Sequence, residues 1–358
     1  MNILLTASFK NGVFCNGLQQ NIVFLCELLK NIGHNPIICL NHKIKECVDP
    51  PNDILVIEEQ EILKESLKID IALQTGWVIS NQIIDALKQK NRIFKNIHIH
   101  YGNRLLADVE QCKWDTVCVP NYKVDEIWVS PHYEFSIPYF KTYYNTNSVK
   151  TLPYIWSPKY IQAHEDIWNK TGKSCKYSPL RPKNIAVLEP NLNLTKNCIP
   201  SIFCAEELIN KEGEDIFNKL VVYCTSSIID KRYFKGLMKN INLTKKSKVI
   251  FQPRIKISKV FSHDCNLVIS HQLLNGLNYT YLEALYFNIP LVHNSEYIKE
   301  YGYFYPQYDT QLGAAALKEA LTCHDENLIQ YEIKSKELIY KYSPENPIVI
   351  EKYKKLLS

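Results

Sequence analysis

The sequence predicts an α/β protein made of two halves, each with its own parallel sheet. The chain has 358 residues, which suggests two domains at roughly 150 residues each. Short apolar runs alternate with segments of helical spacing along most of the chain, the pattern of strand–helix–strand units. A polar stretch with three prolines at residues 157–183 interrupts this alternation and predicts a linker between the halves.

The first half, expected as a domain over residues 1–156, opens with a strand–helix–strand unit. The apolar run 3–7 leads through a loop with two glycines into the helical repeat 18–32, and Gly33 precedes the next apolar run, 36–40. A helix is expected at 82–90. Further strands are expected at 54–57, 69–74, 92–100, 126–130 and 151–155. Strands joined in this way form a parallel sheet that is covered on both faces.

The second half, expected as a domain over residues 184–345, repeats the alternation. Strands are expected at 184–188, 220–224, 249–251, 267–269 and 290–292. Helices are expected at 199–209, 231–240, 257–261, 279–286, 314–321 and 327–342. The end of the chain, 346–358, is expected to form a helix that packs back on the first half.

Composition and charge exclude several classes of protein. Apolar residues make up 46% and charged residues 22% of the chain, which excludes a disordered, collagenous or coiled-coil protein. The net charge of +5 is spread along the sequence, whereas nucleic-acid proteins cluster their cations on one face. No run approaches the 18 or so apolar residues that a membrane helix needs, so no span is expected.

The cysteines and the N-terminus predict a location. Twelve cysteines are scattered without a CxxC pattern, which favours reduced thiols in a core over a disulfide scaffold. The N-terminus lacks the basic and apolar regions of a signal peptide. We therefore expect a cytoplasmic protein, located in the host cytoplasm if the AT-biased composition reflects a viral genome.

The most informative motif spans residues 269–294, ISHQLLNGLNYTYLEALYFNIPLVHN. A strand is followed by a loop with Gly276, a helix that contains Glu283, a turn at Pro290 and another strand. The motif resembles the nucleotide-sugar half of retaining GT-B glycosyltransferases, whose signature is Glu-Gly-Phe-Gly-x-x-x-x-Glu-Ala followed by small-Gly-x-Pro-Val-Val. The resemblance implies a GT-B fold, in which two Rossmann-like domains have parallel sheets facing a central cleft.

The resemblance assigns donor-binding roles within this motif. Glu283 matches the second family glutamate, which holds the ribose hydroxyls, and a carboxylate accepts such bonds with charge assistance. Asn275 replaces the first glutamate and keeps hydrogen-bonding capacity without charge. The amides of the following loop, at a helix N-terminus, would receive the pyrophosphate. The expected donor-binding residues are Asn275, Gly276, Leu277, Asn278, Tyr279, Thr280 and Glu283.

Two cations upstream complete the implied phosphate site. Lys196, in LEPNLNLTKN, matches the family lysine that neutralises the donor phosphate, and Arg254 is a second candidate because arginine suits phosphate. Exposure to solvent is the alternative for each. Downstream, residues 291–296 and 302–306 resemble a narrower, poorly characterised GT-B family of bacteria and large DNA viruses.

The first half offers candidates for the acceptor side. His98 and His100 lie on the same side of the expected strand, close to its carboxyl end. His100 is the preferred group for proton transfer or orientation, and no third ligand at a suitable spacing supports a metal site. His132 follows another strand, and Gly12 and Gly17 flank the first loop, where GT-B enzymes approach phosphate and acceptor. Trp77 is either a sugar platform or a core residue.

These observations predict a glycosyltransferase that moves a sugar from a nucleotide-diphosphate sugar to a saccharide or glycoconjugate. The sequence has no Asp-x-Asp pair, which GT-A enzymes use to bind a metal, so we expect metal-independent transfer without a further cofactor. One alternative is glucosylation of modified DNA bases, which needs a basic groove and base extrusion. Another is a non-catalytic nucleotide- or sugar-binding module, which Asn275 favours. A Rossmann oxidoreductase is disfavoured because neither half has GxGxxG followed by an acidic residue.

Overall fold

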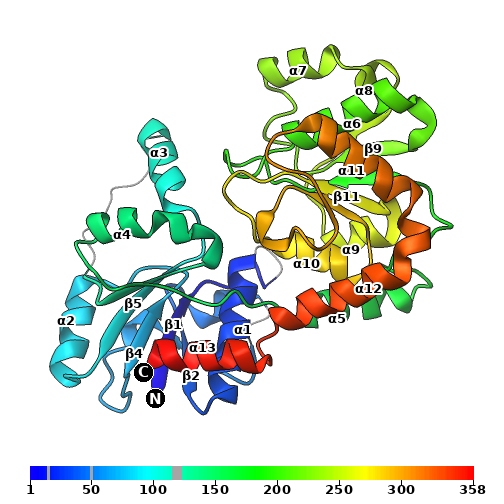
Figure 1. The fold of residues 1–358 in the computed structure, drawn as a ribbon. Coiled ribbons are helices and arrows are strands. Elements are labelled where there is room, and N and C mark those ends of the chain that lie inside the picture. Colours follow the sequence, from blue (N-terminus) through cyan, green and yellow to red (C-terminus); the bar gives the residue numbers. More distant parts are fainter. Residues whose placement is uncertain (14–16, 49–50, 115–122) are drawn as a thin grey trace. The chain divides into compact units, whose positions relative to one another are not determined.

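The computed structural model describes residues 1–13, 17–48, 51–114 and 123–358 (Figure 1). The chain forms two compact units, Met1–Ser157 with Lys341–Ser358, and Pro158–Tyr340. The first unit contains a seven-stranded sheet and the second a six-stranded sheet. All strand pairs in both sheets are parallel. The predicted α/β class with two parallel sheets is confirmed.

The first unit has the strand order β3-β2-β1-β4-β5-β6-β7. Its strands are β1 Asn2–Ala7, β2 Asn35–Leu40, β3 Leu55–Glu58, β4 Ile71–Gln74, β5 Lys95–His100, β6 Glu126–Val129 and β7 Val149–Thr151. Its helices are α1 Gly17–Asn31, α2 Asn81–Lys90, α3 Arg104–Trp114, α4 Ile137–Tyr143 and α13 Pro347–Leu357. The central strands are buried on both faces, as their aliphatic runs require.

The second unit has the strand order β10-β9-β8-β11-β12-β13. Its strands are β8 Asn184–Val187, β9 Lys219–Val222, β10 Val249–Phe251, β11 Leu267–Ser270, β12 Leu291–His293 and β13 Tyr303–Phe304. Its helices are α5 Lys159–Asn169, α6 Ile199–Glu212, α7 Arg232–Lys239, α8 Asn242–Lys245, α9 Ile257–Lys259, α10 Tyr279–Tyr286, α11 Thr310–Thr322 and α12 His324–Lys341. Helices α6 and α11 pack side by side, as Figure 1 shows.

Both sheets reverse their strand order at one point. The reversal lies between β1 and β4 in the first unit and between β8 and β11 in the second. Ligands of doubly wound sheets bind outside the carboxyl ends of the strands at such a point. The loops that follow these four strands are therefore the places where each unit can hold a ligand.

Several elements differ from the sequence-based expectations. The segment 157–183, expected as a linker, contains helix α5, whose Trp168 packs edge-on against His263 with ring centroids 4.7 Å apart. Helices α3 and α4 and the two-residue strand β13 were not expected. The fifth strand begins at Lys95, three residues later than expected at position 92.

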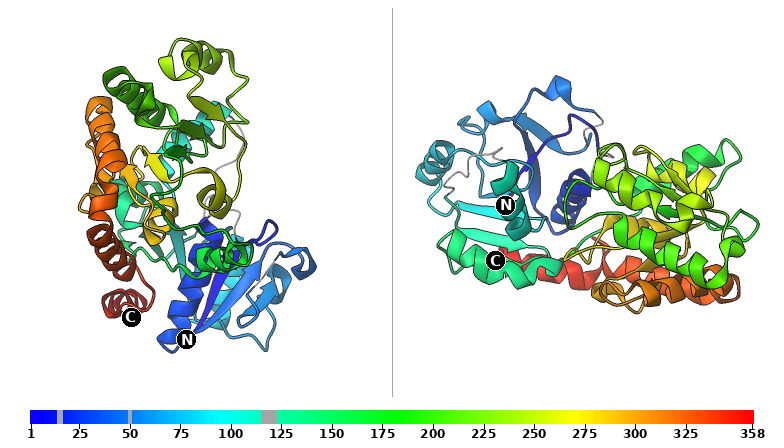
Figure 2. Two further views of the ribbon diagram at one scale, coloured as in Figure 1. Left: turned by 90° about the vertical axis from the view of Figure 1, so that its right-hand side faces the viewer. Right: turned by 90° about the horizontal axis from the view of Figure 1, so that it is seen from above.

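The C-terminal helix α13 belongs to the first unit. The buried Tyr353 hydroxyl donates to the Pro153 carbonyl over 3.0 Å. In the stretch of chain that leads into α13, the Tyr342 carbonyl accepts a hydrogen bond from the Trp156 backbone amide over 2.8 Å. Figures 1 and 2 show this red helix with the elements of the first unit.

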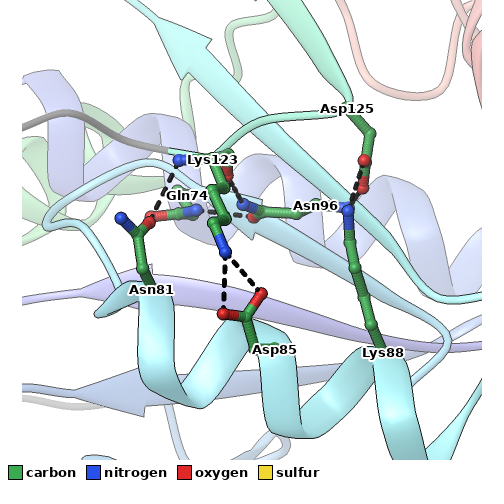
Figure 3. Close-up of polar contacts among 7 residues, drawn as sticks. All are labelled: Gln74, Asn81, Asp85, Lys88, Asn96, Lys123 and Asp125. Carbon is green, nitrogen blue, oxygen red and sulfur yellow. Dashed lines mark hydrogen bonds and ion pairs between the residues drawn. The ribbon is translucent and has the colours of Figure 1, made fainter.

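A polar cluster joins β4, β5 and helix α2 to the chain at residues 123–125 (Figure 3). The buried Gln74 side chain donates to Asn96 over 2.5 Å, and Asn96 donates to the Lys123 carbonyl over 2.5 Å. Ion pairs join α2 to the same segment, Lys88 to Asp125 at 2.6 Å and Asp85 to Lys123 at 2.8 Å. The cluster satisfies buried polar groups and fixes the approach to β6. Its members are Gln74, Asn81, Asp85, Lys88, Asn96, Lys123 and Asp125.

The cysteines that the structure describes are free thiols, and most of them are buried. Burial raises the pKa of the Cys175 thiol to about 12 and that of the Cys204 thiol to about 12, so these groups stay protonated and behave as small apolar residues. Among the described helices, none combines the length and apolar character that crossing a membrane requires.

Candidate functional site

The strand reversal of the second unit brings two loops together. The loop after β8 runs from Glu189 to Lys196, and the loop after β11 runs through Gln272 to the start of α10. Lys196 forms an isolated antiparallel bridge with Gln272, and the Leu273 amide donates to the Thr195 carbonyl over 2.9 Å. Residues from two distant parts of the sequence therefore share the carboxyl edge of one sheet.

Glu189 is the buried centre of this edge, with 2% of its surface exposed. Its carboxylate accepts hydrogen bonds from the Ser270 hydroxyl and, over 2.8 Å, from the side-chain amide of Gln272. Burial raises the pKa of the Glu189 carboxyl to about 7, although the hydrogen bond from Ser270, the charge of Lys196 and the His271 amide act in the opposite direction. Glu189 was not among the site residues expected from the sequence.

Lys196 and Arg254 supply positive charge at the same edge. Burial lowers the pKa of the half-buried Lys196 ammonium, and the charge of Arg254 lowers it further, while Glu189 raises it. No hydrogen bond or ion pair from any described residue reaches the Lys196 ammonium. Arg254 is exposed and follows β10. Two cations that repel each other are a suitable receptor for a phosphate group.

The loop before α10 is tightly packed. A Cβ atom on Gly276 would lie 2.6 Å from the Tyr297 ring, so a side chain there would displace Tyr297, and the Gly276 carbonyl accepts from the Ser295 hydroxyl. Asn278 caps α10, because its side chain accepts from the Thr280 amide over 3.3 Å. The Thr280 amide, expected to receive pyrophosphate, is thus already engaged. Leu277 and Tyr279 are buried.

Glu283 lies on α10, half-buried. Burial raises the pKa of the Glu283 carboxyl to about 7. No hydrogen bond or ion pair reaches this carboxylate from any residue that the structure describes. A desolvated carboxylate without a protein partner is costly for the fold and is characteristic of a ligand-binding group.

His271 and Asn294 connect the ends of β11 and β12. The Asn294 side chain accepts a hydrogen bond from the backbone N–H of Gln272 and donates one to the backbone carbonyl of Gln272, each over 2.9 Å. The His271 Nδ1 atom lies 2.9 Å from the Tyr305 hydroxyl, and burial lowers the pKa of His271 to about 4. His271 is therefore neutral at pH 7. Sequence reasoning missed these residues, although each directly follows a buried strand.

Strained backbone gathers at the same edge. Asn191, Cys224 and Leu274 have φ values of 55°, 60° and 47°, in the left-handed region that residues other than glycine rarely adopt. They follow β8, β9 and β11 respectively. Such residues cluster at binding and catalytic sites, because the surrounding structure holds them against strain. This observation is independent of charge and supports the same location for a ligand.

The raised pKa of Glu283 predicts a pH-dependent cost of folding. An unfolded glutamate titrates near ~4.3, so the folded protein binds more protons between that value and 7, and the stability contribution falls as the pH rises through 7. We expect Glu283→Gln to match the wild-type melting temperature at about pH 5 and to exceed it by a few degrees at about pH 8. Thermal unfolding followed by circular dichroism measures the difference. The comparison cancels the buried histidines, whose effect has the opposite sign. A difference in melting temperature that does not change with pH would contradict the raised pKa of Glu283.

In the first unit, His98 and His100 stack with ring centroids 4.3 Å apart near the carboxyl end of β5. The His100 Nε2 atom lies 3.3 Å from the Tyr144 hydroxyl. Burial lowers the pKa of His98 to about 4 and holds that of His100 well below its usual range, with the Arg104 charge adding to both effects. Both rings are neutral at pH 7 and are held by neighbouring aromatic side chains.

The other candidates of the first unit have structural contacts. Gly12 has φ of 74° and its amide donates to the Phe9 carbonyl over 3.0 Å, which requires glycine in this turn. Gly17 begins α1. His132 is buried against the Tyr133 ring, with centroids 3.9 Å apart. Trp77 packs against the core, and its indole donates to the Cys39 carbonyl over 3.1 Å, which favours the core interpretation.

Within the described ranges, no three His, Cys, Asp or Glu side chains are grouped so that they could hold a metal ion. The charged groups at the carboxyl edge of the second sheet are thus one buried and one half-buried carboxylate, together with the cations Lys196 and Arg254. This set can accept hydroxyl donors and can neutralise an anion.

A protein-family model described as "Protein of unknown function (DUF2827)" matches residues 3–357. The chain belongs to this family. A family of unknown function is consistent with the poorly characterised family that residues 291–296 and 302–306 resemble. No curated protein matches the chain.

Similarity to solved structures identifies the fold of this chain. An α-glucosyltransferase in complex with UDP and a 13-mer DNA containing a HMU base matches with a TM-score of 0.63 and 11% identity, covering 100% of both chains. Sucrose-phosphate synthase from Thermosynechococcus elongatus matches with a TM-score of 0.59 and 11% identity, covering 100% of this chain and 98% of the other. The pneumococcal O-GlcNAc transferase GtfA, in complex with UDP and GlcNAc, gives 0.58 and 11% identity, covering 100% and 98%. The predicted GT-B fold is confirmed.

Proposed function

We propose that this family member transfers a sugar from a nucleotide-diphosphate sugar, held at the carboxyl edge of the second sheet, to a saccharide or glycoconjugate. The observation that carries the proposal is the Glu283 carboxylate, which is desolvated and lacks a described protein partner beside the strand reversal. A ribose offers two hydroxyl donors that would satisfy it with charge-assisted bonds. The sequence signature around Glu283 supports the same role.

Lys196 and Arg254 would stabilise the leaving diphosphate. In the proposed reaction the bond between the anomeric carbon and the phosphate oxygen breaks, and the acceptor oxygen bonds to that carbon and loses its proton. Negative charge then develops on the diphosphate, where a preorganised ammonium lowers the barrier. We extend the proposal to transfer without metal or further cofactor and with retention of configuration, on the strength of the sequence signature.

The acceptor would use residues of the first unit. His100 is neutral and lies near the end of β5, where an imidazole can orient an acceptor hydroxyl or take its proton. His132 and the loop with Gly12 and Gly17 stay predictions for the acceptor side. We also propose a cytoplasmic setting, because free thiols persist in a reducing compartment.

We expect purified protein to release nucleoside diphosphate from at least one member of a panel of UDP, GDP and TDP sugars, and to do so faster with a glycan acceptor. Release is measured by anion-exchange chromatography, with and without EDTA. Equal rates with EDTA support metal-independent transfer. Binding without release under any condition would contradict enzymatic function and favour a non-catalytic binding module.

Modified DNA is the second acceptor class to include. The α-glucosyltransferase with the matching fold was solved with DNA containing a modified base. Transfer to DNA predicts a steep loss of rate with added salt, because phosphate contacts release counterions. Transfer to a neutral saccharide predicts little salt dependence, and we expect this result because the charge of +5 is spread along the chain.

A further inference from the structure

The second unit carries a strongly basic surface on helices α7 and α8, which contact each other at one end of the unit (Figure 1). Lysines and arginines occur throughout the chain, but residues 231–248 contain seven of them and no acidic residue. Helix α12, by contrast, has four acidic residues beside three lysines. Six of the seven cations are exposed and form what we call the α7–α8 surface: Lys231, Arg232, Lys235, Lys239, Lys245 and Lys246.

Helix α7 places its charges on one side. Arg232, Lys235 and Lys239 stand at i, i+3 and i+7, which is one side of a helix. Phe234 is buried on the opposite side, where its ring packs edge-on against Phe251 with centroids 5.5 Å apart. This core contact holds α7 in place, so the three cations face solvent from a fixed support.

Most of the positive charge on the α7–α8 surface has no counter-charge in the protein. Lys235 pairs with Asp230 at 2.8 Å and Lys246 with Glu214 at 3.6 Å, both in solvent-accessible pairs. No hydrogen bond or ion pair from any residue that the structure describes reaches the other four side-chain cations. Six cations and two acidic partners leave an excess of four positive charges. Because exposed ion pairs are weak, a partner with dense negative charge can replace them.

The residue types indicate which partner fits. Five of the six cations are lysines, whose compact, strongly hydrated charge suits a diffuse layer of negative charge, whereas the planar arginine fork suits single phosphates and bases. Tyr233 lies in the same helix with 79% of its surface exposed. Tyrosine is enriched at membrane–water interfaces, where its ring meets lipid and its hydroxyl meets water. Clusters of about four to eight lysines and arginines on amphipathic helices are typical of binding to anionic lipids.

We infer that the α7–α8 surface binds the anionic phospholipid headgroups of a membrane and holds the protein there through charge. The lysines and Arg232 would approach the headgroups, and the Tyr233 ring would enter the layer between headgroups and acyl chains. The inference does not depend on the proposed function, because binding to lipid requires no nucleotide sugar. An enzyme held in this way would meet acceptors that are displayed on the same membrane.

Flotation of the purified full chain with vesicles tests the inference. We expect binding to vesicles of equal parts phosphatidylglycerol and phosphatidylcholine, and none to vesicles of phosphatidylcholine alone. Raising the salt from about 0.1 M to about 1 M shortens the screening length from about 10 Å to about 3 Å and should release the protein. The triple variant Arg232→Gln, Lys235→Gln, Lys239→Gln should bind about 100-fold more weakly, since each cation near an anionic membrane contributes roughly a factor of five.

The matched control removes three cations from exposed positions of α11 and α12, in the variant Lys318→Gln, Lys334→Gln, Lys336→Gln. It changes the net charge by the same amount and should bind the vesicles within about twofold of the wild type, because charges beyond the screening length contribute little. Circular dichroism confirms that both variants are folded. Glutamine favours this outcome, because it is a good helix former.

Several results would overturn the inference. They are a wild type that does not bind phosphatidylglycerol vesicles, equal binding to vesicles with and without this lipid, and equal losses in the two triple variants. Tighter binding to duplex DNA than to the vesicles, compared per phosphate group, would also overturn it and would make the α7–α8 surface a nucleic-acid site. The α7 variant should keep the release of nucleoside diphosphate in solution, because none of its three residues belongs to the candidate site.

Discussion

We expect the Glu283→Gln variant to bind a nucleotide-diphosphate sugar about 100-fold more weakly than the wild type. At about pH 8, above the raised pKa of Glu283, the ionised carboxylate offers two charge-assisted acceptors to the ribose, whereas the amide offers one neutral acceptor and one donor. Hydrogen bonds to charged groups contribute roughly 1.5–3 kcal/mol, and each 1.4 kcal/mol or so is a factor of ten in Kd. Calorimetric titration of both proteins with the same ligand measures the ratio.

A glutamate at an exposed position provides the control for charge removal. Glu326 lies exposed in helix α12, so Glu326→Gln changes the net charge by the same amount. Its affinity should stay within about twofold of the wild type, because exposed charges are screened. An unchanged affinity in Glu283→Gln would remove this residue from the donor site. We expect Glu283→Gln to bind the ligand more weakly and, at about pH 8, to melt at a higher temperature than the wild type. The two results together would show that this carboxylate lowers the stability of the fold and serves a ligand.

The Lys196→Met variant should lower kcat by about 10²–10³, with a smaller change in KM. The ammonium interacts more strongly with the diphosphate as negative charge develops in the transition state than with the bound substrate. Methionine keeps the length and apolar contacts of the half-buried stem and removes only the charge. Initial rates of nucleoside diphosphate release over a range of donor concentrations separate the two parameters.

Lys211 is the matched control for this change. It is exposed on α6 and pairs with the half-buried Glu207 at 2.9 Å, so Lys211→Met should leave both parameters unchanged. A variant at position 196 that raises KM and keeps kcat would show uniform binding of substrate and transition state. That result would contradict a role of Lys196 in the chemical step.

Much of the fold could be predicted because its signals are local. Aliphatic runs such as residues 3–7 and 267–269 have the length and composition of buried strands, and the helices between them have apolar residues at the correct period. Helix α5 was missed because its packing partner, the segment around His263, lies far along the chain. Strand β13 has two residues and is held by pairing with β12, which no local pattern reveals.

The candidate site divides in the same way. Lys196, Asn275 and Glu283 were expected because they stand at fixed spacings in contiguous motifs. Glu189 was missed because its significance comes from Gln272, which is 83 residues further along the chain. Asn278 is in the expected motif, but its side chain caps a helix, a use that the spacing leaves open. The roles assigned to these residues stay predictions until a ligand is measured.

Hydrogen–deuterium exchange with and without a nucleoside diphosphate tests the central claim most directly, because it locates the ligand. The account predicts slower amide exchange in peptides that cover residues 189–197 and 270–283, the two loops at the strand reversal of the second sheet and the helix that carries Glu283. The Glu283→Gln variant should lose this protection at the same ligand concentration. Protection confined to other parts of the chain, or none at these two segments with the ligand bound, would contradict it.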